Sequence, residues 1–194
     1  MSAIRDRLRA AGLAPVHDKV LEGRRLDAED GLRLYRSPDL TAIAWLANLV
    51  RERLHGDTAY FVRNLHINYT NICNKLCKFC SFYTPPRDPA GRGYVVTPEA
   101  AAARVAACNG QPVREIHMVA GINPKLPYSY YLDLLRAVKA ARPEAQIKAF
   151  TMIELAQIAR VARRPLAEVL PELKAAGLAA CPGGGAEVFS ERVH

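Results

Sequence analysis

Three cysteines stand close together at Cys73, Cys77 and Cys80, in a Cys-x3-Cys-x2-Cys run. Cysteine thiolates are the usual ligands of iron–sulfur clusters, and a [4Fe–4S] cluster normally takes four of them. A run of three would leave one iron without a protein ligand, and that iron could bind a small molecule and pass it an electron. The run therefore predicts an iron–sulfur cluster that acts on a bound cosubstrate.

The same cysteines admit a less specific interpretation, a structural zinc site with His66 or His117 as the fourth ligand. Zinc sites usually pair two short Cys-x2-4-Cys knuckles, and this chain has no second pair. A disulfide framework is disfavoured because three clustered cysteines cannot all pair with one another. Cys108 lies in an alanine-rich helical stretch and Cys181 precedes a proline, so both are expected to be small apolar fillers.

Composition narrows the class of protein without deciding its function. The chain has 194 residues, a net charge of +8 and half of its residues apolar, which is globular composition. We expect no membrane span, because no run approaches the ~20 apolar residues required. Free cysteines and a charged N-terminus without an export signal predict the cytoplasm.

The positive charge is scattered, which is typical of solvated helix faces and also suits an anionic small-molecule substrate. A zinc-containing, nucleic-acid-binding module is the alternative from a different class. It lacks a second ligand pair and a basic–aromatic stripe, so we expect no nucleic acid as a partner.

Hydrophobic periodicity predicts helices over residues 1–60 and a change to alternating strands afterwards. Four strands are expected, separated by helices: residues 65–71, 114–120, 146–151 and 178–181. Such alternation predicts a parallel α/β sheet, with functional residues at the C-terminal ends of the strands. Four strands cannot close a barrel. We therefore predict a helical extension (residues 1–60) and a partial TIM-like (β/α) barrel (residues 61–194) that is truncated after about four strands.

Polar residues near the strands are candidates for ligand contacts. His66, Asn68 and Thr70 alternate with apolar neighbours and are expected to point into the barrel lumen, and His117 on the second strand is expected to do likewise. Interior polar groups need partners, which substrate or water could supply. The backbone amides of Gly183, Gly184 and Gly185 could bind a carboxylate. A satisfied interior histidine and a plain glycine turn are the alternatives.

The cysteine motif, with Phe79 before its last cysteine, resembles the signature of radical S-adenosylmethionine (SAM) enzymes. The resemblance implies a partial barrel whose first loop holds a [4Fe–4S] cluster on Cys73, Cys77 and Cys80. SAM would bind the open iron and be cleaved reductively to a 5′-deoxyadenosyl radical. An electron donor such as flavodoxin or ferredoxin is implied as a partner.

The flanking sequences resemble a narrower group, the aminofutalosine synthases of menaquinone biosynthesis. They include LHINYTNICNKLCKFCSFY, EIHMVAGINPKLPYSYYLDLLRAVKAARPEAQIKAFTMIE and PGGGAEVFSERV. The resemblance implies a transferase that adds the adenosyl radical to 3-[(1-carboxyvinyl)oxy]benzoate, a dianion, and releases carbon dioxide. Alternatives are the dehypoxanthine futalosine cyclase of the same pathway, a deazaflavin-forming radical enzyme and an inactive fragment.

The resemblance also implies roles for single residues. Phe79 stands where the family's backbone contacts adenine. Ala120 and Gly121 stand where the family usually carries two glycines beside the SAM amino group, so the first position departs from the pattern. Glu154 follows the third strand, where an acid could bind the SAM ribose or amino group. The alternatives are that Gly121 only turns the chain and that Glu154 only begins a helix.

Overall fold

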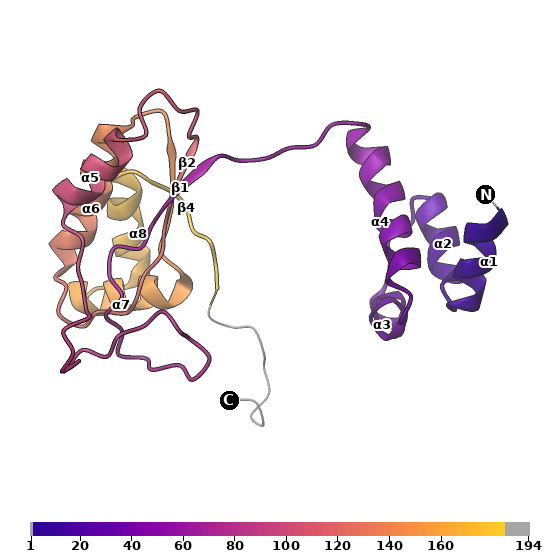
Figure 1. Ribbon diagram of the computed structural model, residues 1–194, viewed down its shortest axis with the longest axis horizontal. Coiled ribbons are helices and arrows are strands. Elements are labelled where there is room, and N and C mark those ends of the chain that lie inside the picture. The colour runs from indigo at the N-terminus through magenta and orange to yellow at the C-terminus, as the bar shows by residue number, and fades with distance from the viewer. Residues whose placement is uncertain (1, 185–194) are drawn as a thin grey trace. The chain divides into compact units, whose positions relative to one another are not determined.

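The computed structural model describes residues 2–184, so the predicted contact by Gly185 lies outside the described residues. The chain divides into two compact units, Met1–Phe61 and Val62–His194, each shown in Figure 1. This division lies one residue from the predicted boundary. The described part of the chain contains no helix that is both long and apolar enough to span a membrane.

The first unit is helical, as predicted. Its helices are α1 (Ser2–Ala10), α2 (Ala14–Leu21), α3 (Ala28–Arg36) and α4 (Leu40–His55). A capping box begins α3, in which Asp27 and Asp30 each accept a hydrogen bond from the other's backbone N–H. The helices pack around one small apolar core: Leu8, Leu13, Val16, Val20, Ala42 and Leu46.

The second unit alternates strands with helices. Its elements are β1 (Asn64–Ile67), α5 (Pro98–Ala106), β2 (Glu115–Met118), α6 (Tyr128–Ala141), β3 (Gln146–Ala149), α7 (Met152–Ala162), α8 (Leu166–Ala175) and β4 (Leu178–Ala180). The four strands are parallel and lie in the order β1-β2-β3-β4. Sequential parallel order with helical crossovers is the arrangement of a (β/α) barrel, so the α/β prediction is confirmed.

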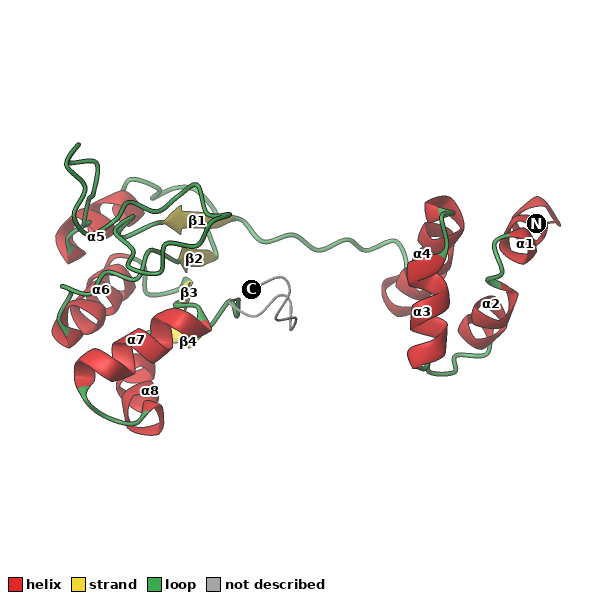
Figure 2. Ribbon diagram, turned by 90° about the horizontal axis from the view of Figure 1, so that it is seen from below, coloured by secondary structure: helices red, strands yellow, loops and turns green. Residues whose placement is uncertain are grey.

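The helices α5, α6 and α8 lie on one side of this sheet (Figures 1 and 2). The strand residues that face them are apolar, and Ile67, Ile116, Met118, Ile147 and Ala149 are all at most 1% exposed. Together with the inner faces of the helices they form the main core of the unit. Burial of this continuous apolar face is the largest favourable contribution to the stability of the unit.

All four strands are shorter than the alternating pattern predicts. The first strand ends at Ile67 rather than Asn71, and the third at Ala149 rather than Thr151. Beyond these ends the backbone leaves the sheet to meet other loops. Tyr69, Tyr131 and Phe150 form an edge-to-face aromatic cluster there, with ring centroids 5.7–6.2 Å apart. Phe150 adopts a left-handed φ of 64°.

Candidate active site at the carboxyl ends of the strands

The first half of the cysteine loop is fixed to two neighbouring segments by backbone hydrogen bonds. The Cys73 amide donates to Thr84 O at 2.9 Å, and the Asn74 amide donates to Ile122 O at 3.1 Å. In return the Thr84 amide donates to Asn71 O at 2.8 Å. The position of Cys73 is therefore set by the chain that follows β2 and by the chain that follows the cysteines.

The side chain of Asn71 adds further hydrogen bonds between the base of the cysteine loop and the segment that follows it. Its side-chain amide donates to Thr84 Oγ1 at 2.9 Å and to Arg92 O at 3.0 Å, while its Oδ1 accepts from the Tyr94 amide at 2.8 Å. Thr70 is fully buried and its hydroxyl donates to Tyr94 O at 2.6 Å. Thr70 was expected to point into the lumen, but its polar group is already satisfied within the chain. These bonds hold the irregular segment 84–96 against the root of the cysteine loop.

Gly121 lies where the backbone of the cysteine loop approaches most closely. A Cβ atom at this position would lie 2.4 Å from Ile72 O and 3.0 Å from the Cβ of Cys73, which a folded chain cannot accommodate without movement. The Gly121 amide also donates to Thr70 O at 2.9 Å. The glycine is therefore required for packing against the first cysteine, a reason that differs from both of the sequence interpretations.

The second half of the cysteine loop has far fewer contacts. Cys77 is exposed, Cys73 and Cys80 are half-buried, and Phe79 is 88% exposed. Leu76, between the first two cysteines, has a left-handed φ of 53°. Accessible thiols on one loop are a donor set that fits an iron–sulfur cluster. Residues 2–184 contain no group of three His, Cys, Asp or Glu side chains gathered closely enough for a single metal ion.

Glu154 joins the C-terminal ends of three strands. Its Oε1 accepts from the Tyr69 hydroxyl at 2.5 Å and from the Ala120 amide at 3.1 Å, and its Oε2 accepts from the Thr151 amide at 2.8 Å. The side chain is 2% exposed. Burial raises the pKa of Glu154, and the hydrogen bonds from Tyr69, Thr151 and Ala120 oppose that rise.

These bonds bear on the predicted SAM contacts. Both oxygens of Glu154 are engaged within the chain, so the structure assigns this acid a positioning role for the loops, and its contact with SAM stays a prediction. The amides of Ala120 and Gly121 are engaged as well. An amino group donates hydrogen bonds, so it would need the carbonyl oxygens of this pair rather than the amides.

The face of the sheet opposite the helices carries a polar row. Strand register sets His66 beside His117 and His117 beside Lys148. The two imidazole rings are edge-to-face at 5.1 Å, and Lys148 Nζ lies 2.9 Å from Glu115 Oε1, which is 3.8 Å from His117 Nδ1. Burial, and then the charge of Lys148, lower the pKa of His117.

The histidines of this row were expected from the alternation, but Lys148 and Glu115 were missed. The same alternation applied to the third strand would have found Lys148, because it follows Ile147 on the opposite face. Asn68 lies on the same face as His66, and its side-chain amide donates to Val119 O at 3.0 Å. Substrate contacts by His66, Asn68 and His117 stay predictions.

The remaining candidate residues lie in less informative surroundings. Gly183 and Gly184 have φ values of 81° and 87°, a region that favours glycine, so backbone conformation alone accounts for them. Their contact with a carboxylate stays a prediction. Cys108 and Cys181 are partly buried and pack against the core of the unit, as expected of apolar fillers.

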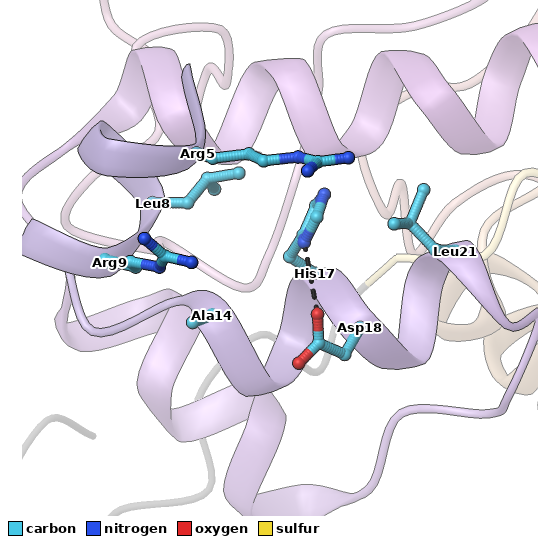
Figure 3. Close-up of a pocket in the computed structure, with 7 residues that line it drawn as sticks. All are labelled: Arg5, Leu8, Arg9, Ala14, His17, Asp18 and Leu21. Atoms are coloured by element: carbon cyan, nitrogen blue, oxygen red, sulfur yellow. Dashed lines mark hydrogen bonds and ion pairs between the residues drawn. The ribbon is translucent and has the colours of Figure 1, made fainter. Parts of the chain in front are cut away.

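A separate hollow of about 280 Å³ lies in the helical unit, far along the chain from the cysteines (Figure 3). Arg5 and Arg9 approach it from α1, and His17 and Asp18 from α2, with His17 Nδ1 3.3 Å from Asp18 Oδ1. It contains none of the residues that the sequence singles out for chemistry. The cysteine loop, rather than this hollow, is the candidate active site.

Comparison with known sequences agrees with the cysteine motif. Residues 67–194 match the family model of the radical SAM superfamily. The chain is 46% identical over 187 residues to the aminodeoxyfutalosine synthase of Thermus thermophilus, covering 96% of this chain and 50% of that protein. It is 36% identical over 178 residues to the cyclic dehypoxanthine futalosine synthase of Halalkalibacterium halodurans, covering 91% and 48%. The chain thus spans about half the length of the curated relatives it matches.

Comparison with solved structures supports the fold. The chain is similar to the FeFe-hydrogenase maturase HydG from Carboxydothermus hydrogenoformans, with a TM-score of 0.56 and 15% identity. The match covers 93% of this chain and 49% of that one. Proteins of the matching family use a [4Fe–4S] cluster and SAM, and the spacing of Cys73, Cys77 and Cys80 fits their motif, which favours the cluster over zinc. The chain belongs to the radical SAM superfamily.

Proposed function

We propose that this chain is part of an enzyme of menaquinone biosynthesis that transfers the 5′-deoxyadenosyl group of SAM to 3-[(1-carboxyvinyl)oxy]benzoate. The product is aminofutalosine, formed with loss of carbon dioxide. The observation that carries the proposal is the 46% identity, across 96% of the chain, to a protein named aminodeoxyfutalosine synthase. We place the enzyme in the cytoplasm, with flavodoxin or ferredoxin as its electron donor.

The cysteine loop supports the proposal because it carries three free thiols at the spacing of the family motif. Cys73, Cys77 and Cys80 would hold the [4Fe–4S] cluster as thiolates. When bound, the cluster supplies the electron that cleaves SAM reductively. Gly121 and Asn71 hold the root of the loop, so the first ligand is fixed before the cofactor arrives. The exposed second half can then adjust to the cluster.

The polar row lies on the face that the described helices leave uncovered, and it would bind substrate. His66, His117 and Lys148 lie abreast on neighbouring strands. Lys148 offers a cation to one carboxylate of the dianion, and the imidazoles offer N–H donors beside it. Glu115 holds the lysine in place at 2.9 Å. In a closed barrel these groups would be removed from water, where pairing with an anion is stronger.

The cyclase of the same pathway is the second candidate, because the chain is 36% identical to a cyclic dehypoxanthine futalosine synthase. A deazaflavin-forming enzyme is a third possibility within the superfamily. The difference in identity, 46% against 36%, favours the synthase.

Product analysis tests the proposal. The 194-residue chain and a version extended through further barrel strands are reconstituted without oxygen and given SAM, a reductant and the enolpyruvyl benzoate. We expect the extended enzyme to form aminofutalosine, identified by mass, and the short chain to be inactive because an open site admits water and side reactions. A cyclised product with free 5′-deoxyadenosine, formed from another substrate, would assign the cyclase function instead.

A further inference from the structure

A second hollow lies beside the cysteine loop, and its lining is unusual in composition. It measures about 470 Å³, within the usual size of small-molecule sites. Lys75 enters from the cysteine loop, and the rest of the lining comes from one helix, α7: Met152, Ile153, Ala156, Gln157 and Arg160. Of these six lining residues, three are apolar, two are cations, one is an uncharged amide and none is an acid.

The two cations have no carboxylate partner among the described residues. Arg160 uses Nε to donate to Gln157 Oε1 at 3.0 Å, which leaves its remaining N–H groups for other acceptors. Two positive side chains around an apolar surface repel one another and gain from an anion between them. An ammonium group would find no acidic partner in this lining. The hollow therefore favours an anion over a zwitterion.

Gln157 supplies an independent observation. It is only 5% exposed, and its side-chain nitrogen is buried with no hydrogen-bond partner in the described part of the chain. A buried amide N–H group without an acceptor is destabilising, so such groups are rare in folded proteins. Gln157 lines the hollow, so a turn of its side chain would bring this nitrogen to an acceptor bound there.

We propose that this hollow binds the carboxylate of an aromatic or aliphatic acid that carries no ammonium group. The carboxylate pairs with Lys75 and Arg160 and accepts from Gln157 after its side chain turns, while the apolar part of the ligand lies on Met152, Ile153 and Ala156. This site is distinct from the histidine row, and it stands whether or not the proposed function is correct.

Benzoate is the probe that tests this site. The isotope-labelled 194-residue chain is titrated with benzoate, with its uncharged isostere benzamide and with methionine, while backbone and side-chain amide resonances are followed by NMR. We expect benzoate to shift the Gln157 side-chain signals and the signals of Lys75 and Arg160, with little response to the other two compounds. Benzamide or methionine binding as tightly as benzoate would overturn the proposal.

Two substitutions remove the charges while keeping the apolar stems. Lys75→Met and Arg160→Met should each weaken benzoate binding about fivefold, the scale of one partly exposed ion pair, and the double variant should show no saturable shift. Arg104→Met removes an exposed cation from α5 and should leave binding unchanged. Each variant must keep the dispersed spectrum of the parent, which shows that it is folded. Unchanged affinity in the folded double variant would refute the site.

Discussion

The two faces of the parallel sheet are built by alternate residues of the same strands, and they differ in almost every property. On the face under the helices Ile116, Met118 and Ile147 are at most 1% exposed. On the opposite face His117 and Lys148 form a polar row with His66. The apolar face forms the core, and the opposite face carries side chains that can donate hydrogen bonds or bear charge. A TIM barrel interior is usually filled with bulky apolar side chains, and the polar row departs from that pattern, which is why we propose it as the substrate site.

The cysteines also fall into two groups, three in the motif loop and two packed against the core. Substitutions in these two groups should differ more than any other pair of changes. Replacing Cys73, Cys77 or Cys80 by Ala should remove the cluster entirely, because each supplies one of only three protein thiolates. Cys108→Ala and Cys181→Ala should keep it, because those thiols pack against the core of the unit. Iron and sulfide per chain after anaerobic reconstitution provide the measurement. Stoichiometric zinc without sulfide, or equal loss in the control pair, would contradict the assignment.

Substitutions on adjacent residues of β3 test the covered face against the uncovered one. Ile147→Ala removes a fully buried side chain and should lower the free energy of unfolding by about 2–5 kcal/mol. Lys148→Ala, one residue later, should change it by less than about 1 kcal/mol, since its ion pair with Glu115 is partly exposed. Urea unfolding followed by circular dichroism measures both. Similar losses in the two variants would mean that the uncovered face is also structural.

Gly121 follows β2 and lies against the backbone of the cysteine loop. Gly121→Ala would place a methyl group against Ile72 O and should lower the free energy of unfolding by about 1–3 kcal/mol, as overpacking does. It should also lower the iron content, because Cys73 must move. Gly31→Ala is the matched control, with open space around the added atom in α3, and should be neutral or slightly stabilising. An unaltered stability and iron content in the first variant would show that the loop adjusts freely.

The sequence predicted what depends on local pattern. Alternation located both faces of β1 and β2, and the cysteine spacing identified the cofactor. It did not predict where the strands end. That depends on contacts between distant segments, such as the hydroxyl of Thr70 on Tyr94 O and the hydroxyl of Tyr69 on Glu154.

The same limit applies to the site. Gly121 looks like a turn glycine in the sequence, and only the fold brings Ile72 O within 2.4 Å of its missing side chain. Glu154 looks like a helix-start acid, which it is, but its bonds to Tyr69 and Ala120 join strands that are far apart in sequence. Gln157 gives no sequence signal, because an unpartnered amide can be recognised only when its surroundings are known.

The smallest expected effect is a pH dependence confined to the uncovered face. His117 has a lowered pKa, first because burial disfavours the imidazolium and then because Lys148 and His66 repel it. The unfolded chain then binds more protons than the folded chain between the lowered pKa and the ordinary value near 6.5. The neutral ring's contribution to stability is therefore fully present above about pH 6.5 and is lost as the pH falls through that value towards the folded pKa.

Replacing His117 by Gln should remove this slope while leaving the stability near pH 8 almost unchanged. The measurement is the midpoint of urea unfolding at closely spaced pH values from 5 to 8, compared between the parent and the variant, so that titration of other groups cancels. His55→Gln, in α4 of the helical unit, is the control for the loss of a histidine from the other unit. If His117→Gln and the parent have parallel profiles, His117 titrates as it does in the unfolded chain. The polar row would then be too accessible to water to bind substrate unless further strands enclosed it.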